Sequence, residues 1–127
     1  MEKQVILSLR APKVVGPYSQ AVRLGNFVFT AGQIPLNPHD SSMVGTDVQG
    51  QIVQVLENLS HLLQDAGTSL DHVLKTTMFL KDMNDFAKAN EIYGRYFKLP
   101  YPARSTLEVA RLPKDALVEI EAIAFVP

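Results

Sequence analysis

The sequence predicts an α+β domain in which two helices cover one face of a mixed β-sheet. The expected elements follow the order β-β-β-α-β-α-β-β along residues 1–127, and two segments carry apolar residues at helical spacing. The last expected strand is apolar on both of its sides. The length suits one domain, and no repeat, low-complexity segment or shift in composition divides the chain.

The first three strands are expected in residues 4–9, 20–24 and 27–31. The second and third form a hairpin, because Gly25-Asn26 between them supplies the residues that a tight turn needs. Residues 32–45 contain two prolines and two glycines, so they are expected to form a loop.

The first helix is expected to begin at a capping box formed by Thr46 and Gln49 and to end at Gly67. Its apolar residues fall on one continuous stripe. They are Val48, Ile52, Val55, Leu56, Leu59, Leu62 and Leu63. Gly50 inside this helix costs about 1 kcal/mol relative to alanine, and the sequence offers no reason for its presence.

A strand rich in β-branched residues is expected over residues 72–80, and Asn84 is expected to cap a second helix. The apolar stripe of this helix consists of Phe86, Ala89, Tyr93, Tyr96 and Phe97. Asn90 lies on the same stripe, so its amide is expected to be buried and hydrogen-bonded. Pro100 and Pro102 separate this helix from the final strands.

Residues 102–125 read as a pair of strands joined by a turn at Pro113-Lys114-Asp115. The second strand has one wholly apolar side, formed by Val118, Ile120, Ala122, Ala124 and Val126. Its other side is also largely apolar, through Leu117, Ile123 and Phe125. Two helices cover only one face of a sheet, so the other face requires a partner chain. The pattern therefore predicts an obligate homo-oligomer.

Composition narrows the classes of function. Twelve basic and thirteen acidic residues give a net charge of −1 without a basic stripe, which argues against a nucleic-acid partner. The absence of cysteine excludes disulfides, thiolate chemistry and cysteine-ligated zinc. No apolar run reaches membrane-spanning length, and the N-terminus lacks a signal-peptide layout. A cytoplasmic protein without a membrane partner is therefore expected.

Charges within the final apolar strands are the main candidates for chemistry. Arg104 shares a strand face with Thr106, and a guanidinium held on a strand suits a carboxylate ligand. The alternative is a structural ion pair with Glu119 or Glu121. In a hairpin centred near Lys114, Arg104 and Glu119 would lie about 13 Å apart. They would then meet only across a contact between chains.

The remaining candidates are less informative. His39, His61 and His72 lack the spacing of metal ligands on a helix, and no phosphate-binding glycine motif or nucleophile elbow is present. Tyr18 lies in the loop Gly16-Pro17-Tyr18-Ser19. Its ring is equally well interpreted as a surface aromatic or as the wall of a small-ligand site.

The chain resembles the RidA family (reactive intermediate deaminase A, also called YjgF-like or L-PSP). The matching motifs occur in the family's order over nearly the whole chain. They are Gly16-Pro17-Tyr18-Ser19-Gln20-Ala21, Gly32-Gln33-Ile34-Pro35, Val73-Leu74-Lys75-Thr76-Thr77, Asn84-Asp85-Phe86 through Asn90, Pro102-Ala103-Arg104-Ser105, and Glu119 followed by Ile120-Glu121-Ala122-Ile123-Ala124.

The resemblance implies a chorismate-mutase-like fold with a six-stranded sheet, assembled as a homotrimer with ligand clefts between subunits. Members of the family hydrolyse 2-iminobutanoate and 2-iminopropanoate to 2-oxo acids and ammonia without metal or cofactor. The resemblance further implies that Arg104 binds the substrate carboxylate and that Glu119 positions or deprotonates water. The implied substrate-binding groups are the Tyr18 ring, the backbone N–H groups of Gly32 and Thr106, and the Asn90 amide.

Two positions depart from the pattern of many members: Ala31 stands where serine is common, and Thr106 where cysteine is common. Loss of the hydroxyl at Ala31 would weaken substrate or water positioning, whereas Thr106 matters less if only its N–H is used. Two other functions stay open. One is a regulatory protein that binds 2-oxo acids without turnover. The other is a single-strand-RNA endonuclease or translation inhibitor, which the near-neutral charge disfavours.

Overall fold

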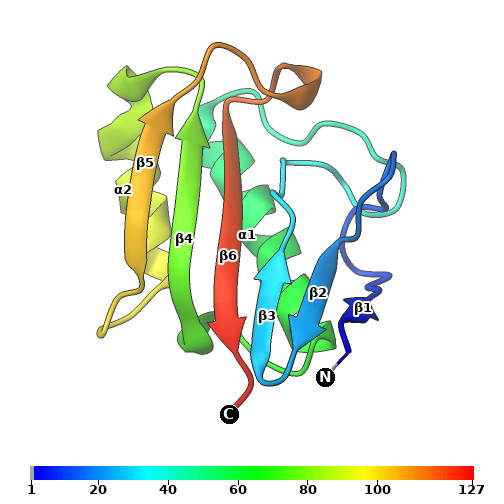
Figure 1. Ribbon diagram of the computed structural model, residues 1–127. Coiled ribbons are helices and arrows are strands. Elements are labelled where there is room, and N and C mark those ends of the chain that lie inside the picture. The colour runs from blue at the N-terminus through cyan, green and yellow to red at the C-terminus, as the bar shows by residue number, and fades with distance from the viewer. Residues whose placement is uncertain (1) are drawn as a thin grey trace.

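The computed structural model describes residues 2–127 as one six-stranded sheet with both helices behind it (Figure 1). The strand order is β1-β2-β3-β6-β4-β5. The strands are β1 (Gln4–Ile6), β2 (Ala21–Leu24), β3 (Phe27–Thr30), β4 (Val73–Leu80), β5 (Ala103–Glu108) and β6 (Val118–Phe125). The helices are α1 (Val48–Asp65) and α2 (Phe86–Tyr96). The predicted α+β class and the placement of both helices on one face are confirmed.

The expected hairpin of β2 and β3 is present. Leu24 pairs with Phe27 across a two-residue turn, in which Gly25 adopts a φ of 58°. Glycine suits this turn because a left-handed backbone conformation costs it little. β1 then pairs antiparallel with β2 and forms one edge of the sheet.

The last two strands do not form the predicted pair. β5 pairs in parallel with β4, and β6 lies between β3 and β4, antiparallel to both. The physical reason is the position of α2 between β4 and β5, because a helical crossover returns the chain in the direction that parallel pairing needs. The 3-10 turn Pro113–Asp115 then lies in the connection that takes the chain past the end of β4 to β6.

The core forms between the sheet and α1. All seven residues of the predicted α1 stripe are buried, and they pack with the inward side chains of β6. Those side chains are Val118, Ile120, Ala122 and Ala124. Burying a large aliphatic side chain contributes about 1.5–3 kcal/mol, so the α1 stripe is a principal source of stability and holds the sheet rigid behind any site built on it.

The N-terminal cap of α1 is Asp47 and not Thr46. The Asp47 carboxylate accepts a hydrogen bond of 2.8 Å from the Gly50 N–H, and a carboxylate also interacts favourably with the positive end of the helix. The geometry also accounts for Gly50, because an added Cβ would lie 3.1 Å from Asp47 Oδ1 and 3.5 Å from Gly45 Cα. Gly67, with a φ of 92°, follows the helix as predicted.

The start of α2 also differs from the prediction. A single 3-10 turn, Met83–Asp85, precedes the helix, and the Asp82 carboxylate accepts a hydrogen bond of 2.9 Å from the Asn84 N–H. Asp82 therefore caps this turn by accepting from the Asn84 N–H, and the Asn84 side chain is not the cap of α2. An aspartate at the head of a turn competes well for this role, because its carboxylate can accept from the N–H group two residues later.

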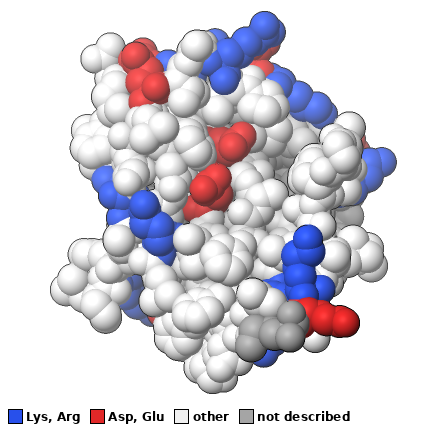
Figure 2. Space-filling view, viewed as in Figure 1, with Lys and Arg blue, Asp and Glu red and all other residues white. Residues whose placement is uncertain are grey.

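The face of the sheet opposite the helices is uncovered within residues 2–127 (Figure 1). Along β6 the inward residues are buried, whereas Ile123 and Phe125 on the other side stay partly exposed. In β3, Phe27 and Phe29 are 50% and 42% exposed. Figure 2 shows this face as largely uncharged, with acidic side chains near its centre. The prediction of a second apolar face is confirmed only in part, because Ile123 and Phe125 share the open side of β6 with Glu119 and Glu121. The exposed apolar side chains of β3 and β6 still mark an interaction surface.

Candidate functional site

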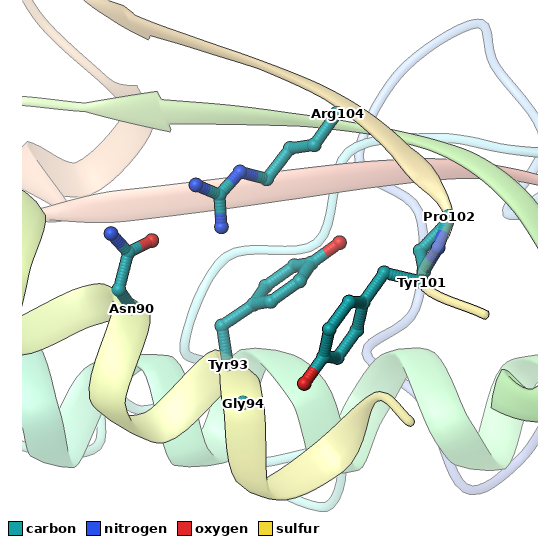
Figure 3. Close-up of a pocket in the computed structure, with 6 residues that line it drawn as sticks. All are labelled: Asn90, Tyr93, Gly94, Tyr101, Pro102 and Arg104. Atoms are coloured by element: carbon teal, nitrogen blue, oxygen red, sulfur yellow. The ribbon is translucent and has the colours of Figure 1, made fainter. Parts of the chain in front are cut away.

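Arg104 projects from β5 toward the helices. It lies beside Thr76 of β4 in the parallel ladder, and the Thr76 side chain is fully buried on the helix side. The guanidinium carbon lies 4.7 Å from the centre of the Tyr93 ring and 5.5 Å from that of Phe86. Figure 3 shows the guanidinium between Asn90 and Tyr93 of α2. Both contacts are within the range of cation–π attraction.

The Arg104 guanidinium has no polar partner among the described residues. The ion pairs within residues 2–127 are Arg10–Asp65, Arg95–Glu91 and Arg111–Asp115, so none includes Arg104. The Arg104 side chain also makes no hydrogen bond in these residues. The alternative of a structural ion pair with Glu119 or Glu121 is therefore wrong within one chain. All N–H donors of a partly buried guanidinium remain available, which is the arrangement that a carboxylate ligand needs.

A cavity of about 410 Å³ opens beside this guanidinium. It is lined by Asn90, Tyr93, Gly94, Tyr101, Pro102 and Arg104 (Figure 3). Contrary to the prediction, the Asn90 amide is not fully satisfied, because its Oδ1 is buried without a hydrogen-bond partner in residues 2–127. A buried acceptor without a donor is unfavourable by about 1–3 kcal/mol. A donor brought from outside the chain would remove this cost.

Tyr93 is fixed by a hydrogen bond beneath Arg104. Its hydroxyl lies 2.7 Å from the Thr76 hydroxyl, and this contact is buried. Burial raises the pKa of the Tyr93 phenol, while the bond to Thr76 and the charge of Arg104 act in the opposite direction. The phenol therefore stays neutral, and its ring offers an uncharged face to the guanidinium.

Glu119 lies on the opposite face of the sheet. It pairs with Phe79 of β4, and its strand neighbours Val118 and Ile120 point into the core, so alternation directs Glu119 to the open side. Together with Tyr18 and Gly32 it lines a second cavity of about 590 Å³. The cavity wall is largely apolar, and Lys13 and Lys114 also line it.

The Glu119 carboxyl is perturbed by its surroundings. Burial raises its pKa above the usual range of a glutamate, and the negative charge of Glu121 on the same face raises it further. Glu119 makes no ion pair or hydrogen bond with its side chain in the described part of the chain. A carboxylate with a raised pKa is a better proton acceptor, so this group is suited to accept a proton from water.

Tyr18 and Gly32 line the same cavity as Glu119, and each has a defined local geometry. The Tyr18 hydroxyl accepts a hydrogen bond of 3.2 Å from the Val15 N–H, which holds the ring in its loop although the residue is 52% exposed. A Cβ on Gly32 would lie 2.7 Å from Glu119 Cδ and collide with its carboxylate. Any side chain at this position would therefore force the Glu119 carboxylate to move away from the backbone of residue 32.

The predicted site residues fall into two separate groups. Tyr18, Gly32 and Glu119 share one cavity, and Asn90 and Arg104 share the other. Thr106 is on the same strand face as Arg104 but lines neither cavity.

The two charged candidates are separated by the sheet itself. Arg104 lies on the edge strand β5, and Glu119 lies two strands away on β6 and on the other face. Two strand spacings alone amount to about 10 Å. The distance expected for a hairpin rested on a pairing that does not exist, yet the two groups also stay apart in the observed sheet.

Sequence reasoning missed two aromatic residues of the Arg104 cavity. The sequence pattern places Tyr93 on the core stripe of α2, and its phenol is the only signal of another role, since a buried tyrosine hydroxyl needs a partner. Tyr101, which is 57% exposed between two prolines, had no periodicity that would single it out. Tyr93 and Tyr101 line the Arg104 cavity only because the α2 crossover places β5 beside β4, next to α2.

Comparison with known proteins identifies the family of the chain. The family model described as Endoribonuclease L-PSP matches residues 8–126. The chain belongs to this family. Among its L-PSP relatives, a RutC family protein of Pyrococcus horikoshii is 56% identical, over 97% of this chain and 98% of the relative. Another, from Synechocystis, is 53% identical over 100% of this chain and 99% of the relative.

Solved structures confirm the resemblance to the RidA branch of L-PSP proteins. A Rid family protein from Yersinia pestis superposes with a TM-score of 0.95 and 47% identity, covering 98% of this chain and 100% of that one. RidA from an Antarctic Psychrobacter gives 0.93 and 41%, covering 97% and 99%. E. coli TdcF, solved with bound serine, gives 0.91 and 46%, covering 96% and 98%. The fold expected from the L-PSP motifs is thereby confirmed.

Residues 2–127 of this L-PSP chain contain no group of three or more histidine, aspartate or glutamate side chains placed to hold a metal ion. Neither helix of the described chain has the length and hydrophobicity needed to cross a bilayer.

Proposed function

We propose that this protein hydrolyses reactive 2-imino acids, 2-iminobutanoate and 2-iminopropanoate, to 2-oxo acids and ammonia. The observation that carries the proposal is the Arg104 guanidinium, which is partly buried in a cavity without any carboxylate or hydrogen-bond partner in residues 2–127. A 2-imino acid presents a planar carboxylate that fits this fork by two parallel hydrogen bonds. The related TdcF was solved with bound serine, which supports a small amino-acid-like ligand.

The proposed reaction needs one ordered water and no covalent intermediate. Glu119 accepts a proton from the water as its oxygen adds to C2 of the protonated imine, which gives a carbinolamine. Glu119 then returns this proton to the nitrogen, and the C2–N bond breaks to release ammonia while the hydroxyl loses its proton and becomes the C=O group. The raised pKa of Glu119 favours this role near neutral pH. Fixing the carboxylate on Arg104 orients C2 toward the water, so positioning supplies much of the acceleration.

The site requires two chains, because Arg104 and Glu119 lie on opposite faces of one sheet. We infer a homotrimer in which Arg104 and Asn90 of one subunit face Tyr18, Gly32 and Glu119 of the next. The uncovered apolar face, with Phe27 and Phe29 exposed, supports assembly through this surface. In the cleft, the unpartnered Asn90 Oδ1 would accept from the substrate, and the Gly32 and Thr106 N–H groups would donate to it.

The names of related proteins keep other functions open. Some L-PSP relatives with solved structures carry endoribonuclease or translation-inhibitor names, and the second candidate from the sequence is a 2-oxo-acid sensor. The net charge of −1 gives little attraction to an RNA backbone. A cavity with a free guanidinium fits a carboxylate ligand in either the enzyme or the sensor.

The assay that tests the proposal generates imines with an amino-acid oxidase and traps them with semicarbazide. The protein is expected to lower semicarbazone formation in a concentration-dependent way and to raise 2-oxo acid formation. Saturable binding of 2-oxobutanoate without any effect on trapping would indicate the sensor instead. Cleavage of single-stranded RNA without an effect on trapping would favour the endonuclease.

Replacement of Gly32 by alanine is expected to lower imine hydrolysis at least about tenfold, because the added Cβ displaces the Glu119 carboxylate by more than a site tolerates. Thermal unfolding and oligomer size should stay close to those of the wild type. Ala31→Ser, a change in the neighbouring residue, is the matched control and should not lower the rate. Equal activity of the Gly32→Ala and wild-type proteins would remove Glu119 from the reaction.

A further inference from the structure

The Arg104 guanidinium is held by aromatic rings and by no acid. Its central carbon lies over the Tyr93 ring at 4.7 Å and near the Phe86 ring at 5.5 Å. Phe86 is 37% exposed, whereas Tyr93 is only 6% exposed. Tyr93 is therefore the closer and the more rigid of the two supports.

An aromatic support has a specific consequence for ligand binding. A structural carboxylate beside Arg104 would occupy the N–H donors and compete with a substrate carboxylate. An aromatic ring stabilises the positive charge but offers no oxygen acceptor, so it leaves the guanidinium free to form N–H···O hydrogen bonds with a carboxylate. The absence of a polar partner for Arg104 in the described residues fits this arrangement.

The ring itself is fixed from below. The Tyr93 hydroxyl and the buried Thr76 hydroxyl lie 2.7 Å apart, and Thr76 pairs with Arg104 in the ladder between β4 and β5. The strand that carries the arginine is thus tied to the strand that fixes the ring. These contacts hold the guanidinium beside the Tyr93 ring before a ligand arrives, which lowers the ordering cost of binding.

We propose that Tyr93 is a positioning residue, which presents the Arg104 guanidinium to a carboxylate ligand through its ring face and is itself oriented by Thr76. The proposal rests on the proposed function, because the ligand is a 2-imino or 2-oxo acid. It adds that carboxylate recognition depends on an aromatic ring that need not contact the ligand. Carboxylate binding requires the aromatic ring of Tyr93, and the Tyr93 hydroxyl only helps to fix the orientation of that ring.

The test compares Tyr93→Leu, which removes the ring, with Tyr93→Phe, which keeps it. Tyr93→Leu is expected to raise KM for the imine and Kd for 2-oxobutanoate about tenfold, which lies between the values of an exposed and a fully desolvated cation–π contact. Tyr93→Phe and Thr76→Val should each change these constants less than threefold, a small effect of lost orientation. Ile92→Val, a conservative change at a buried neighbour in α2 outside the cavity, is the control for damage to helix packing.

A chemical-rescue measurement separates positioning from a structural role. In Arg104→Ala, free methylguanidinium at millimolar concentration is expected to restore part of the affinity for 2-oxobutanoate, because the Tyr93 ring still binds the cation. The double variant Arg104→Ala/Tyr93→Leu should show no rescue. Rescue in the double variant, or equal Kd values for wild type and Tyr93→Leu, would overturn the proposal. If the wild type binds 2-oxobutanoate but does not hydrolyse imines, the proposed reaction fails while these Kd values still decide the role of Tyr93.

Discussion

Replacing Arg104 by alanine is expected to lower kcat/KM for imine hydrolysis by at least about a hundredfold, since a desolvated charge pair with the substrate is lost. The semicarbazide assay should then show trapping at the rate seen without protein. The fold of the subunit should persist, because within the described residues Arg104 makes no ion pair or hydrogen bond that its loss would break.

Lysine at position 104 is the matched variant for this experiment. It keeps the positive charge but loses the planar fork, so we expect Arg104→Lys to recover only a small part of the activity. Full activity in Arg104→Lys would mean that charge alone is sufficient. Full activity in Arg104→Ala would remove the carboxylate clamp from the mechanism.

Glu119 is expected to control the acid limb of the pH–rate profile. Its pKa is raised first by burial and then by the charge of Glu121, so kcat/KM should fall as the pH drops through a value above the usual glutamate range. Glu119→Gln should lose activity by about a hundredfold or more at all pH values, as removal of a general base does. Glu121→Gln should stay active, and its acid limb should move to lower pH because one source of the shift is gone.

The same perturbation predicts a pH dependence of stability. Because the folded-state pKa of Glu119 lies above its unfolded value, the folded protein binds the proton more tightly, and stability falls as the pH rises between the two values. Below the unfolded pKa this penalty is absent. Urea unfolding at neutral pH should therefore find Glu119→Gln at least as stable as the wild type, with a smaller difference in acid. A large loss of stability in Glu119→Gln would show that the carboxylate has a structural partner.

The sequence predicted the parts of the fold that depend on local pattern. The α1 stripe and the hairpin at Gly25-Asn26 follow from the pattern of side chains along one segment, and the structure confirms them. The apolar second side of residues 118–125 is confirmed only in part, because Glu119 and Glu121 share it with Ile123 and Phe125. The predicted cap of α1 is wrong, because Thr46 and Asp47 are both good capping residues and only the backbone path at Gly45 decides between them.

The predicted pairing of β5 with β6 is wrong for a different reason. Neighbouring strands in a sequence pair often enough that a hairpin was the simplest expectation, but the α2 crossover places β5 beside β4. This error also hid the surroundings of Arg104. The arginine could be identified from its type and position, whereas its contacts with Tyr93 and Phe86 depend on which strand neighbours β5 and on which face it presents.

The division of the candidate site between two sheet faces is the feature on which the proposed mechanism depends most. The proposed mechanism therefore needs each cleft to take Arg104 from one subunit and Glu119 from the next. Two inactive variants, Arg104→Ala and Glu119→Gln, should therefore complement each other when they are unfolded together and refolded as a mixture. In a closed ring mixed at random in equal amounts, about one quarter of the clefts combine two intact groups.

The decisive measurement is imine hydrolysis by this refolded mixture, beside each variant refolded alone. A shared cleft predicts recovery of about one quarter of the wild-type activity in the mixture, from clefts formed between neighbouring subunits. Activity in the mixed oligomers no greater than the mean of the two variants would place Arg104 and Glu119 in the same chain's site, or one of them outside it, and would contradict the shared cleft.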